Sequence, residues 1–328
     1  MSYDIAVIPG DGIGPEVVEA EIEVLKATGV DFAFSTYDAG DDCLARTGEA
    51  LPQETLEAAR KAKAVIFGAA GACAAQVIIR LRQELSTWVN LRPSRCYSGV
   101  DCLHQGTDLV VVRENSEGLY LGLEETPEPG LALATRRITE AASLRIARYA
   151  FQYAQEQGRN KVSAAHKVNV LPKTEGLFLD CCRRAAGEFP DIAYEEVLID
   201  SMAMHMVQRP QDFSVIVTTN MFGDIISDLA AGLIGGLGMC PSANLGDDHA
   251  LFEPVHGTAP DIAGQGKANP SAAILCGAML LRHLGEIEAA KGMEAALDAC
   301  LVQRQTTADL GGSLSTMEMA RAVADQMG

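Results

Sequence analysis

The chain has 328 residues, a hydrophobic fraction of 48%, a formal net charge of −18 and a pI near 4.7. This length exceeds one typical hydrophobic core, so we expect two domains or one domain with a large lobe. The acidity argues against a nucleic-acid-binding protein, because a phosphate backbone demands clustered Lys and Arg side chains.

The N-terminal residues contain neither the basic nor the apolar region of a signal peptide. No segment approaches the roughly eighteen uninterrupted apolar residues of a membrane-spanning helix. We therefore expect a cytoplasmic protein with no membrane partner. Nine cysteines are scattered along the chain, with no CxxC pair and no histidine at metal-ligand spacing. We expect them to be reduced thiols.

The first predicted strand covers residues 4–9, and the first helix follows the GDGIGP turn at residues 10–15 and runs to about Thr28. Pro15 suits the first helical position, where no backbone N–H is missed. The glycines of this turn alternate and do not match the GxGxxG pattern of a dinucleotide-binding loop. They predict a tight turn rather than a Rossmann loop.

Strands followed by helices recur along the rest of the chain. Predicted strands cover residues 64–67, 87–92, 109–113, 161–166, 193–199 and 215–219; predicted helices cover 56–61, 75–85, 141–157, 173–188 and 272–284, with two more within 289–328. This alternation predicts an α/β fold with a parallel-type sheet. Residues 131–139 alternate in part and predict an exposed ribbon, which a partner subunit would cover.

The stretch of residues 215–246 indicates a cation site. Its apolar strand ends at Asn220, Gly223 turns the chain into a helix, and Asp224 and Asp228 follow four residues apart. Their carboxylates would share one helix face, about 5–6 Å apart at the β-carbons, and carboxylate oxygens are what a hard divalent cation prefers. The alternative is that both acids only favour the helix dipole and lie in solvent.

Polar side chains also follow other predicted strands, at Arg92, Arg113, Lys167 and Asp200. Open α/β sheets bind ligands beyond the carboxyl ends of their strands. These coincidences predict a shared cleft.

Seven segments carry a family resemblance. They are IPGDGIGPEV at 8–17, LR and RP nine residues apart within 81–93, RENSEGLY at 113–120, HKVNV at 166–170, IDSMAMH at 199–205, NMFGDIISD at 220–228 and EPVHGTAPDIAGQGKANP at 253–270. In this order they resemble the β-decarboxylating dehydrogenases, which act on isopropylmalate, homoisocitrate or isocitrate. The chain looks most similar to the archaeal 3-isopropylmalate enzymes, including those that also act on 3-methylmalate, and the tail at 306–320 fits that branch.

The resemblance implies an isopropylmalate dehydrogenase-like fold, with two α/β domains around a central cleft and no Rossmann fold. Residues 1–88 and 236–328 would form the cofactor-side domain, and residues 89–235 the inserted substrate and dimerisation domain. The family's enzymes are homodimers with shared active sites, in which Lys167 and Asp200 would serve the neighbouring subunit; pairing of dimers into a tetramer stays open.

The family match also implies roles for polar residues. Asp200, Asp224 and Asp228 would bind Mg²⁺ or Mn²⁺, which polarises the substrate's C2 oxygen. Arg82, Arg92 and Arg113 would clamp the substrate carboxylates, although any one of them alone would more simply form a surface ion pair. Lys167 would accept the hydroxyl proton, and Tyr120 would return a proton to the enolate carbon. Their structural alternatives are a partner for Asp200 and a core tyrosine.

The loop at residues 253–269 matches the family's cofactor segment. His256, Gly257 and Ala259 resemble its adenosine-cradling residues, and Asn269 would contact adenine. Asp261 would bond the ribose hydroxyls and repel a 2′-phosphate, and with Ile262 it replaces the Lys-Tyr pair that favours NADP. We therefore expect NAD, with Asn169 near the nicotinamide.

Departures from the family patterns bear on the substrate. Gln76 and Ile78 stand where bacterial isocitrate dehydrogenases carry a serine and an asparagine. An apolar run there disfavours a charged substituent, because an unpaired buried carboxylate is costly. Ala75 replaces the glutamate of bacterial isopropylmalate enzymes, which leaves the size of the alkyl group open, and Arg80 leaves room for a homoisocitrate-type chain.

We expect an NAD-dependent oxidoreductase that converts 3-isopropylmalate to 4-methyl-2-oxopentanoate and CO₂, as in leucine biosynthesis, with 3-methylmalate as a further substrate. The alternatives are a homoisocitrate or isocitrate dehydrogenase and, from another class, a non-catalytic regulatory subunit. Such a subunit would be expected to lack the tyrosine, lysine or aspartates named above, which this chain retains.

Overall fold

The computed structural model describes residues 2–328, which divide into two compact units. Unit 1 contains the chain up to Thr87, Cys96–Leu103 and Ile234–Gly328, and unit 2 contains Trp88–Arg95 and His104–Leu233. Residues 96–103, which the sequence division assigned to the inserted domain, group with unit 1. The roles expected for the two domains stay predictions.

Unit 1 contains five strands in the order β2-β1-β3-β12-β11. They are β1 (Tyr3–Gly10), β2 (Phe32–Thr36), β3 (Ala64–Ala69), β11 (Pro241–Leu245) and β12 (Ala250–Pro254). All neighbours are parallel except β11 and β12. All six residues of β3 are buried, as the continuous apolar pattern of a parallel strand covered on both faces requires.

The helices of unit 1 are α1 (Gly14–Ala27), α2 (Asp41–Thr47), α3 (Gln53–Lys61), α4 (Arg80–Glu84), α9 (Ser271–His283), α10 (Ile287–Val302) and α11 (Thr316–Asp325). Pro15 lies in the first turn of α1, as predicted. The predicted helix at 75–85 is confirmed in position, but it opens with a π-helical segment, Ala75–Ile79, before α4 begins. Short 3₁₀ turns occupy Leu237–Met239 and Ala308–Leu310.

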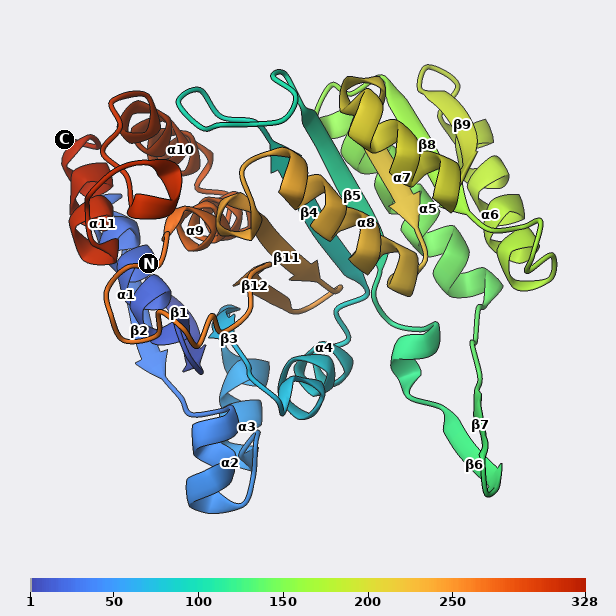
Figure 1. Ribbon diagram of the computed structural model, residues 1–328, viewed down its shortest axis with the longest axis horizontal. Coiled ribbons are helices and arrows are strands. Elements are labelled where there is room, and N and C mark those ends of the chain that lie inside the picture. Colours follow the sequence, from blue (N-terminus) through green and yellow to red (C-terminus); the bar gives the residue numbers. More distant parts are fainter. Residues whose placement is uncertain (1) are drawn as a thin grey trace. The chain divides into compact units, whose positions relative to one another are not determined.

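Unit 2 contains five strands in the order β4-β5-β10-β8-β9 (Figure 1). They are β4 (Val89–Arg95), β5 (Asp108–Glu114), β8 (Lys161–His166), β9 (Ala193–Leu198) and β10 (Val215–Thr218). The helices are α5 (Glu140–Glu156), α6 (Thr174–Glu188), α7 (Ile199–Gln208) and α8 (Asn220–Leu233), with 3₁₀ turns at Leu119–Leu121 and Pro210–Asp212.

The predicted ribbon is the second strand of a hairpin formed by β6 (Glu124–Glu128) and β7 (Leu131–Ala134). Both strands are exposed along their whole length, and Figure 1 shows the hairpin extending away from the helices of unit 2. Leu131 and Leu133 are 39% and 44% exposed. Their cover by a partner subunit stays a prediction.

The α/β fold is confirmed, but the expectation of a parallel-type sheet is wrong for two strand pairs. β4 and β5 are antiparallel, as are β11 and β12. Only residues 246–249 join β11 to β12, and no helix separates β4 from β5. A parallel pair needs a crossover connection of a dozen or more residues, usually a helix, whereas a short loop returns the chain antiparallel.

The start of α8 also differs from the prediction. The helix begins at Asn220, so Gly223 lies inside it and does not form a turn. A β-carbon on Gly223 would lie 2.6 Å from Cγ of Arg113. This glycine therefore permits the close approach of the arginine side chain.

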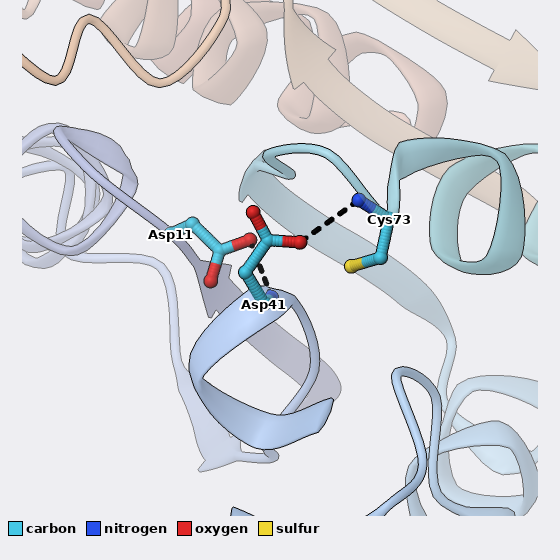
Figure 2. A group of neighbouring side chains, drawn as sticks. All are labelled: Asp11, Asp41 and Cys73. Atoms are coloured by element: carbon cyan, nitrogen blue, oxygen red, sulfur yellow. Dashed lines mark hydrogen bonds between the residues drawn. The ribbon is translucent and has the colours of Figure 1, made fainter. Parts of the chain in front are cut away.

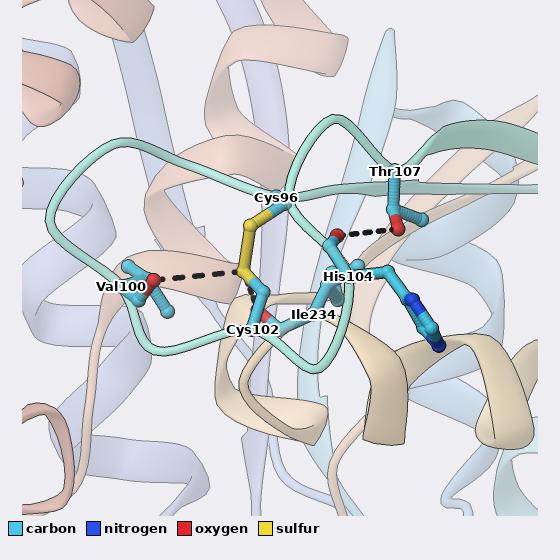
Figure 3. The surroundings of a disulfide bond; sticks show 6 residues. All are labelled: Cys96, Val100, Cys102, His104, Thr107 and Ile234. Carbon is cyan, nitrogen blue, oxygen red and sulfur yellow. Dashed lines mark hydrogen bonds between the residues drawn. A yellow bond between two sulfur atoms is a disulfide. The ribbon is translucent and has the colours of Figure 1, made fainter. Parts of the chain in front are cut away.

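The expectation that all cysteines are reduced thiols is wrong for two of them. Cys96 and Cys102 form a disulfide with their Cα atoms 6.2 Å apart (Figure 3). In the loop between them Gly99 adopts a positive φ, and a β-carbon there would lie 2.3 Å from the carbonyl oxygen of Leu301. The other seven cysteines are buried thiols that form no disulfide. Among the described residues, no helix is long and apolar enough to cross a membrane.

Candidate active site

Arg113 lies at the end of β5 and is fully buried. Its Nε and Nη2 donate to Oδ1 of Asn220 at 3.0 and 2.7 Å, and its Nη1 forms an ion pair with Asp224. Asn220 and Asp224 together fix the orientation of the Arg113 guanidinium. A guanidinium with a fixed orientation can position a carboxylate by directional, charge-assisted hydrogen bonds.

Arg92, on β4, brings a second buried cation to the same two acids. Its Nη1 lies 3.3 Å from Oδ1 of Asp224 and 3.4 Å from Oδ1 of Asp228, and it donates to Oγ of Ser227 at 2.7 Å. The side chain is only 8% exposed. Unit 2 therefore gathers two arginines around the acidic face of α8.

Tyr120 completes this cluster. Its hydroxyl donates to Asp224, and the guanidinium of Arg113 lies 4.8 Å from the centre of its ring. Burial raises the pKa of Tyr120, and the hydrogen bond to Asp224 raises it further. The phenol therefore keeps its proton at neutral pH, as a proton donor must.

The predicted face of α8 carries both acids, and their side chains remain accessible, at 36% for Asp224 and 55% for Asp228. Partial burial raises the pKa of Asp228, with Arg92 lowering it and Asp224 raising it. Two neighbouring carboxylates that remain accessible to solvent fit a hard divalent cation.

Lys167 follows β8, and Asp200 lies in the first turn of α7 rather than at the strand end where it was predicted. Nζ of Lys167 contacts Oδ1 of Asp200 at 2.6 Å, and this hydrogen bond lowers the pKa of Asp200. Asn169, two residues beyond Lys167, is exposed.

Within the described residues of one chain, Asp200 forms no three-residue ligand group with Asp224 and Asp228. The resemblance implies that Asp200 of a second copy would complete a metal site with Asp224 and Asp228. That arrangement stays a prediction.

A different group of metal-type ligands lies in unit 1, where Asp11, Asp41 and Cys73 approach one another (Figure 2). Their oxygens are already engaged. Asp11 accepts from the backbone N–H groups of Asp41 and Gly71 at 2.8 and 2.9 Å, and Asp41 accepts from those of Ala72 and Cys73 at 2.7 and 2.8 Å. Burial and the neighbouring Asp41 raise the pKa of Cys73 to about 12. A thiol must ionise to bind a metal, and Cys73 stays protonated at neutral pH. We therefore interpret this group as a structural hydrogen-bond network that joins the segments containing Asp11, Asp41 and Cys73.

Arg82 lies on α4 of unit 1, where its Nη2 contacts Oε1 of Glu253 on β12 at 2.6 Å. The same oxygen accepts from Nδ2 of Asn244 at 2.7 Å. Both charged side chains are about nine-tenths buried, at 10% and 9% exposed. Ile78, one turn before Arg82, is partly buried and packs against the core.

The predicted cofactor loop rests on the glycine-rich turn after β1. The backbone N–H of Ile13 donates to the carbonyl of Thr258 at 2.9 Å. Gly12 has a positive φ, and a β-carbon there would lie 2.2 Å from the carbonyl oxygen of Thr258, so only glycine fits. The prediction of a tight turn is confirmed. The turn contacts the backbone of the loop that contains His256, Gly257 and Ala259.

The loop residues differ in how far their polar atoms are engaged. Nε2 of His256 is buried without a hydrogen-bond partner, and burial lowers the pKa of this imidazole. A buried nitrogen of this kind is a position that a bound ligand could satisfy. Asp261 is exposed, whereas Asn269 is buried and donates to Asp309 while accepting from the N–H of Ser271.

Sequence reasoning missed the residues that hold the arginines: Asn220, Ser227, Asn244 and Glu253. Asn220 was interpreted only as the end of a strand. Its position two residues after the end of β10, where other predicted strands also end in polar residues, was the available signal.

A family model described as isocitrate/isopropylmalate dehydrogenase matches residues 4–323. The chain belongs to this family. It is 56% identical to a 3-isopropylmalate dehydrogenase of Archaeoglobus fulgidus, covering 98% of both chains, and 53% identical to a 3-isopropylmalate/3-methylmalate dehydrogenase of Methanocaldococcus jannaschii, covering 99% of both. It also resembles the crystal structure of isocitrate dehydrogenase from Methylococcus capsulatus, with a TM-score of 0.96, 44% identity and 99% of each chain covered. The chain is therefore a dehydrogenase-family oxidoreductase, and the predicted family and fold are confirmed.

Proposed function

We propose that this protein is an NAD- and divalent-metal-dependent dehydrogenase that oxidises and decarboxylates a 3-alkylmalate, with 3-isopropylmalate as its main substrate. The observation that carries the proposal is the cluster in unit 2, where two accessible carboxylates on one face of α8 lie against two buried arginines and a protonated tyrosine. This set can hold a cation and an anionic substrate together.

The alkyl substituent is supported by two observations. The relatives that act on 3-isopropylmalate share 53–56% identity with this chain, against 44% for the isocitrate dehydrogenase of known structure. Ile78, which replaces an asparagine of bacterial isocitrate dehydrogenases, offers no partner to a third carboxylate. 3-Methylmalate is proposed as a second substrate, and homoisocitrate and isocitrate remain the competing substrates.

The donor chemistry fits the metal and the cofactor. Asp224 and Asp228, with Asp200 of the partner subunit, would hold Mg²⁺ or Mn²⁺ through carboxylate oxygens. His256, Gly257, Ala259, Asp261, Ile262 and Asn269 would hold NAD, with Asn169 toward the nicotinamide. When bound, the ion would withdraw electrons from the C2 oxygen and NAD would accept the hydride.

The chain's own side chains would bind the substrate and move its protons. Arg82, Arg92 and Arg113 would orient the carboxylates by charge-assisted hydrogen bonds. Lys167 would take the proton of the C2 hydroxyl, and Tyr120, held by Asp224, would donate a proton to the carbon that loses CO₂. Since Lys167 is proposed to serve a neighbouring copy, we propose a homodimer, with assembly into a tetramer left to measurement. We also propose a cytoplasmic location.

Steady-state formation of NADH would test the proposal. The purified protein should turn over 3-isopropylmalate with NAD and Mg²⁺ or Mn²⁺, lose this activity with a chelator, and prefer NAD to NADP. It should act less efficiently on homoisocitrate and isocitrate. A higher kcat/KM with either tricarboxylate would overturn the substrate assignment.

Variants of Tyr120 and Lys167 distinguish the proposed catalytic function from that of a non-catalytic regulatory subunit. Tyr120→Phe and Lys167→Ala should each lower kcat by about 10²–10⁴-fold, the range for loss of a general acid or base. Unchanged turnover in both would remove these residues from the mechanism. Absence of turnover by the parent protein with every substrate would favour a regulatory subunit.

A further inference from the structure

A buried ion pair in unit 2 lies outside the proposed chemistry. Glu175, in the first turn of α6, is 0% exposed, and Arg136, which lies between β7 and α5, is 14% exposed. Nη2 of Arg136 pairs with Oε1 of Glu175. Replacing such a pair by apolar side chains is often neutral or stabilising, because desolvation offsets the attraction. Stability alone therefore does not account for it.

The carboxylate of Glu175 holds the backbone of Lys167. Its Oε2 accepts from the backbone N–H of Lys167 at 2.8 Å, while Nζ of Lys167 contacts Asp200 at 2.6 Å. One carboxylate thus fixes the main chain of this lysine and another contacts its ammonium group.

Arg136 binds the junction between β10 and α8. Its Nη2 donates to Oγ1 of Thr219 at 2.9 Å, and its guanidinium lies 5.4 Å from the centre of the Phe222 ring. A further bond, 3.2 Å long, runs from Nη1 to Oγ1 of Thr174. Thr219 immediately precedes Asn220, which holds Arg113.

The pair therefore connects two segments that are far apart in the sequence. On one side lies the loop with Lys167; on the other lies the start of α8, with Asn220 and Asp224. A displacement of about 1 Å in a reacting group can lower a rate by about 100-fold, so the relative position of these segments matters for turnover.

We propose that Arg136 and Glu175 are positioning residues, which fix the main chain of Lys167 relative to the β10–α8 junction. This inference rests on the proposed function, in which Lys167 removes the hydroxyl proton. The Arg136–Glu175 pair would keep the main chain of Lys167 in a fixed position without contacting the substrate. In a dimer with shared sites, the same pair would join the part of unit 2 that serves its own site to the part that serves the neighbouring one.

The test uses double variants of the full-length protein, so that neither charge is left alone in the core. Arg136→Met with Glu175→Met removes both charges and the acceptor for the Lys167 N–H. Arg136→Met with Glu175→Gln removes both charges but keeps an oxygen for that N–H. We expect the first variant to lose about 100-fold in kcat, with KM for 3-isopropylmalate within about threefold, since the arginines that bind substrate are untouched. The glutamine variant should recover at least about tenfold of the loss.

A matched control is available on the exposed surface of α5 and α6. Arg148 on α5 pairs with Glu188 on α6, and both side chains are exposed. Arg148→Met with Glu188→Gln should leave kcat and KM unchanged. Thermal unfolding of all variants reports their stability separately.

Two outcomes would overturn the proposal: kcat of the Met–Met variant within about twofold of the parent, or an equal kcat loss in the Met–Met and Met–Gln variants. If the Met–Met variant does not fold, Arg136→Lys carries the same kcat-against-KM comparison, because it keeps the charge but loses the fork to Thr174 and Thr219. Unchanged turnover in Lys167→Ala would instead refute the proposed function, independently of these results.

Discussion

Two clusters of this protein bring acidic side chains together but differ in what the carboxylate oxygens contact. In unit 1, the carboxylates of Asp11 and Asp41 accept backbone N–H groups beside the protonated thiol of Cys73. In unit 2, Asp224 pairs with Arg113 and Arg92 and accepts from the Tyr120 hydroxyl, and Asp228 lies beside Arg92 on the same accessible helix face. Proximity of acids is common to both, so it does not identify a metal site. What differs is the partners of the oxygens, which are backbone N–H groups in unit 1 and arginine and tyrosine side chains in unit 2.

The largest effect should follow from removing a charge in unit 2. Asp228→Asn keeps the shape of the side chain but weakens a hard-cation ligand, so we expect kcat/KM to fall by about a thousandfold, equivalent to several kcal/mol of transition-state stabilisation. Titration of Mn²⁺ by calorimetry in the presence of substrate should show weaker binding. Asp11→Asn is the control, because its oxygens serve the backbone, and its Mn²⁺ affinity should match the parent. Equal loss of Mn²⁺ affinity in Asp228→Asn and Asp11→Asn would show that the two clusters do not differ in metal binding.

Another carboxylate of unit 1 extends the comparison, because it is buried without a hydrogen-bond partner. Glu21, on α1, is 0% exposed and both of its oxygens lack hydrogen bonds. Burial raises its pKa well above the ordinary value of 4.5. The Cys276 thiol on α9 faces it, and burial and Glu21 raise the pKa of that thiol as well. The folded protein therefore retains a proton that the unfolded chain releases above about pH 4.5.

This linkage makes stability fall as pH rises above 4.5, by up to about 1.4 kcal/mol per pH unit until the carboxyl ionises in the folded state. Glu21→Gln cannot ionise, so it should match the parent near pH 4 and become more stable than the parent by pH 7. Urea unfolding across this range measures the difference. Glu19→Gln, on the exposed face of the same helix, should show no such divergence. A constant difference at every pH would show that Glu21 does not titrate as described.

The sequence predicted these clusters unequally, for physical reasons. Spacing of four residues placed Asp224 and Asp228 on one helix face, because helix geometry is local. The contacts of Arg113 with Asn220, and of Arg82 with Glu253, join residues 107 and 171 positions apart, which no local pattern reveals. The antiparallel pairing of β4 with β5 escaped prediction because the alternation of strands and helices elsewhere in the chain favoured parallel pairs, whereas no helix lies between these two strands.

Substitutions in the group of Asp11, Asp41 and Cys73 in unit 1 should change the free energy of unfolding but not the catalytic rate. Asp11→Ala removes the acceptor for the N–H groups of Asp41 and Gly71, and leaving buried donors unsatisfied costs about 1–3 kcal/mol. Chemical unfolding should detect this loss, while Mn²⁺ affinity stays at the parent value. A variant with parent stability would mean that water replaces the carboxylate without cost, and this group would then need another explanation.

The smallest effect concerns the glycine that lets Arg113 approach α8. Helix propensity alone predicts that Gly223→Ala is stabilising by about 1 kcal/mol, but the added β-carbon would lie 2.6 and 2.7 Å from Cγ and Cβ of Arg113. Overpacking typically costs about 1–3 kcal/mol, and displacement of Arg113 from Asp224 should lower kcat/KM by about tenfold. Gly232→Ala lies in the same helix with nothing within 4 Å of the new β-carbon, so it should gain stability and keep full activity. If both alanines behaved alike, the position of Arg113 against α8 would not matter for turnover, and the accessible acids alone would have to account for the site.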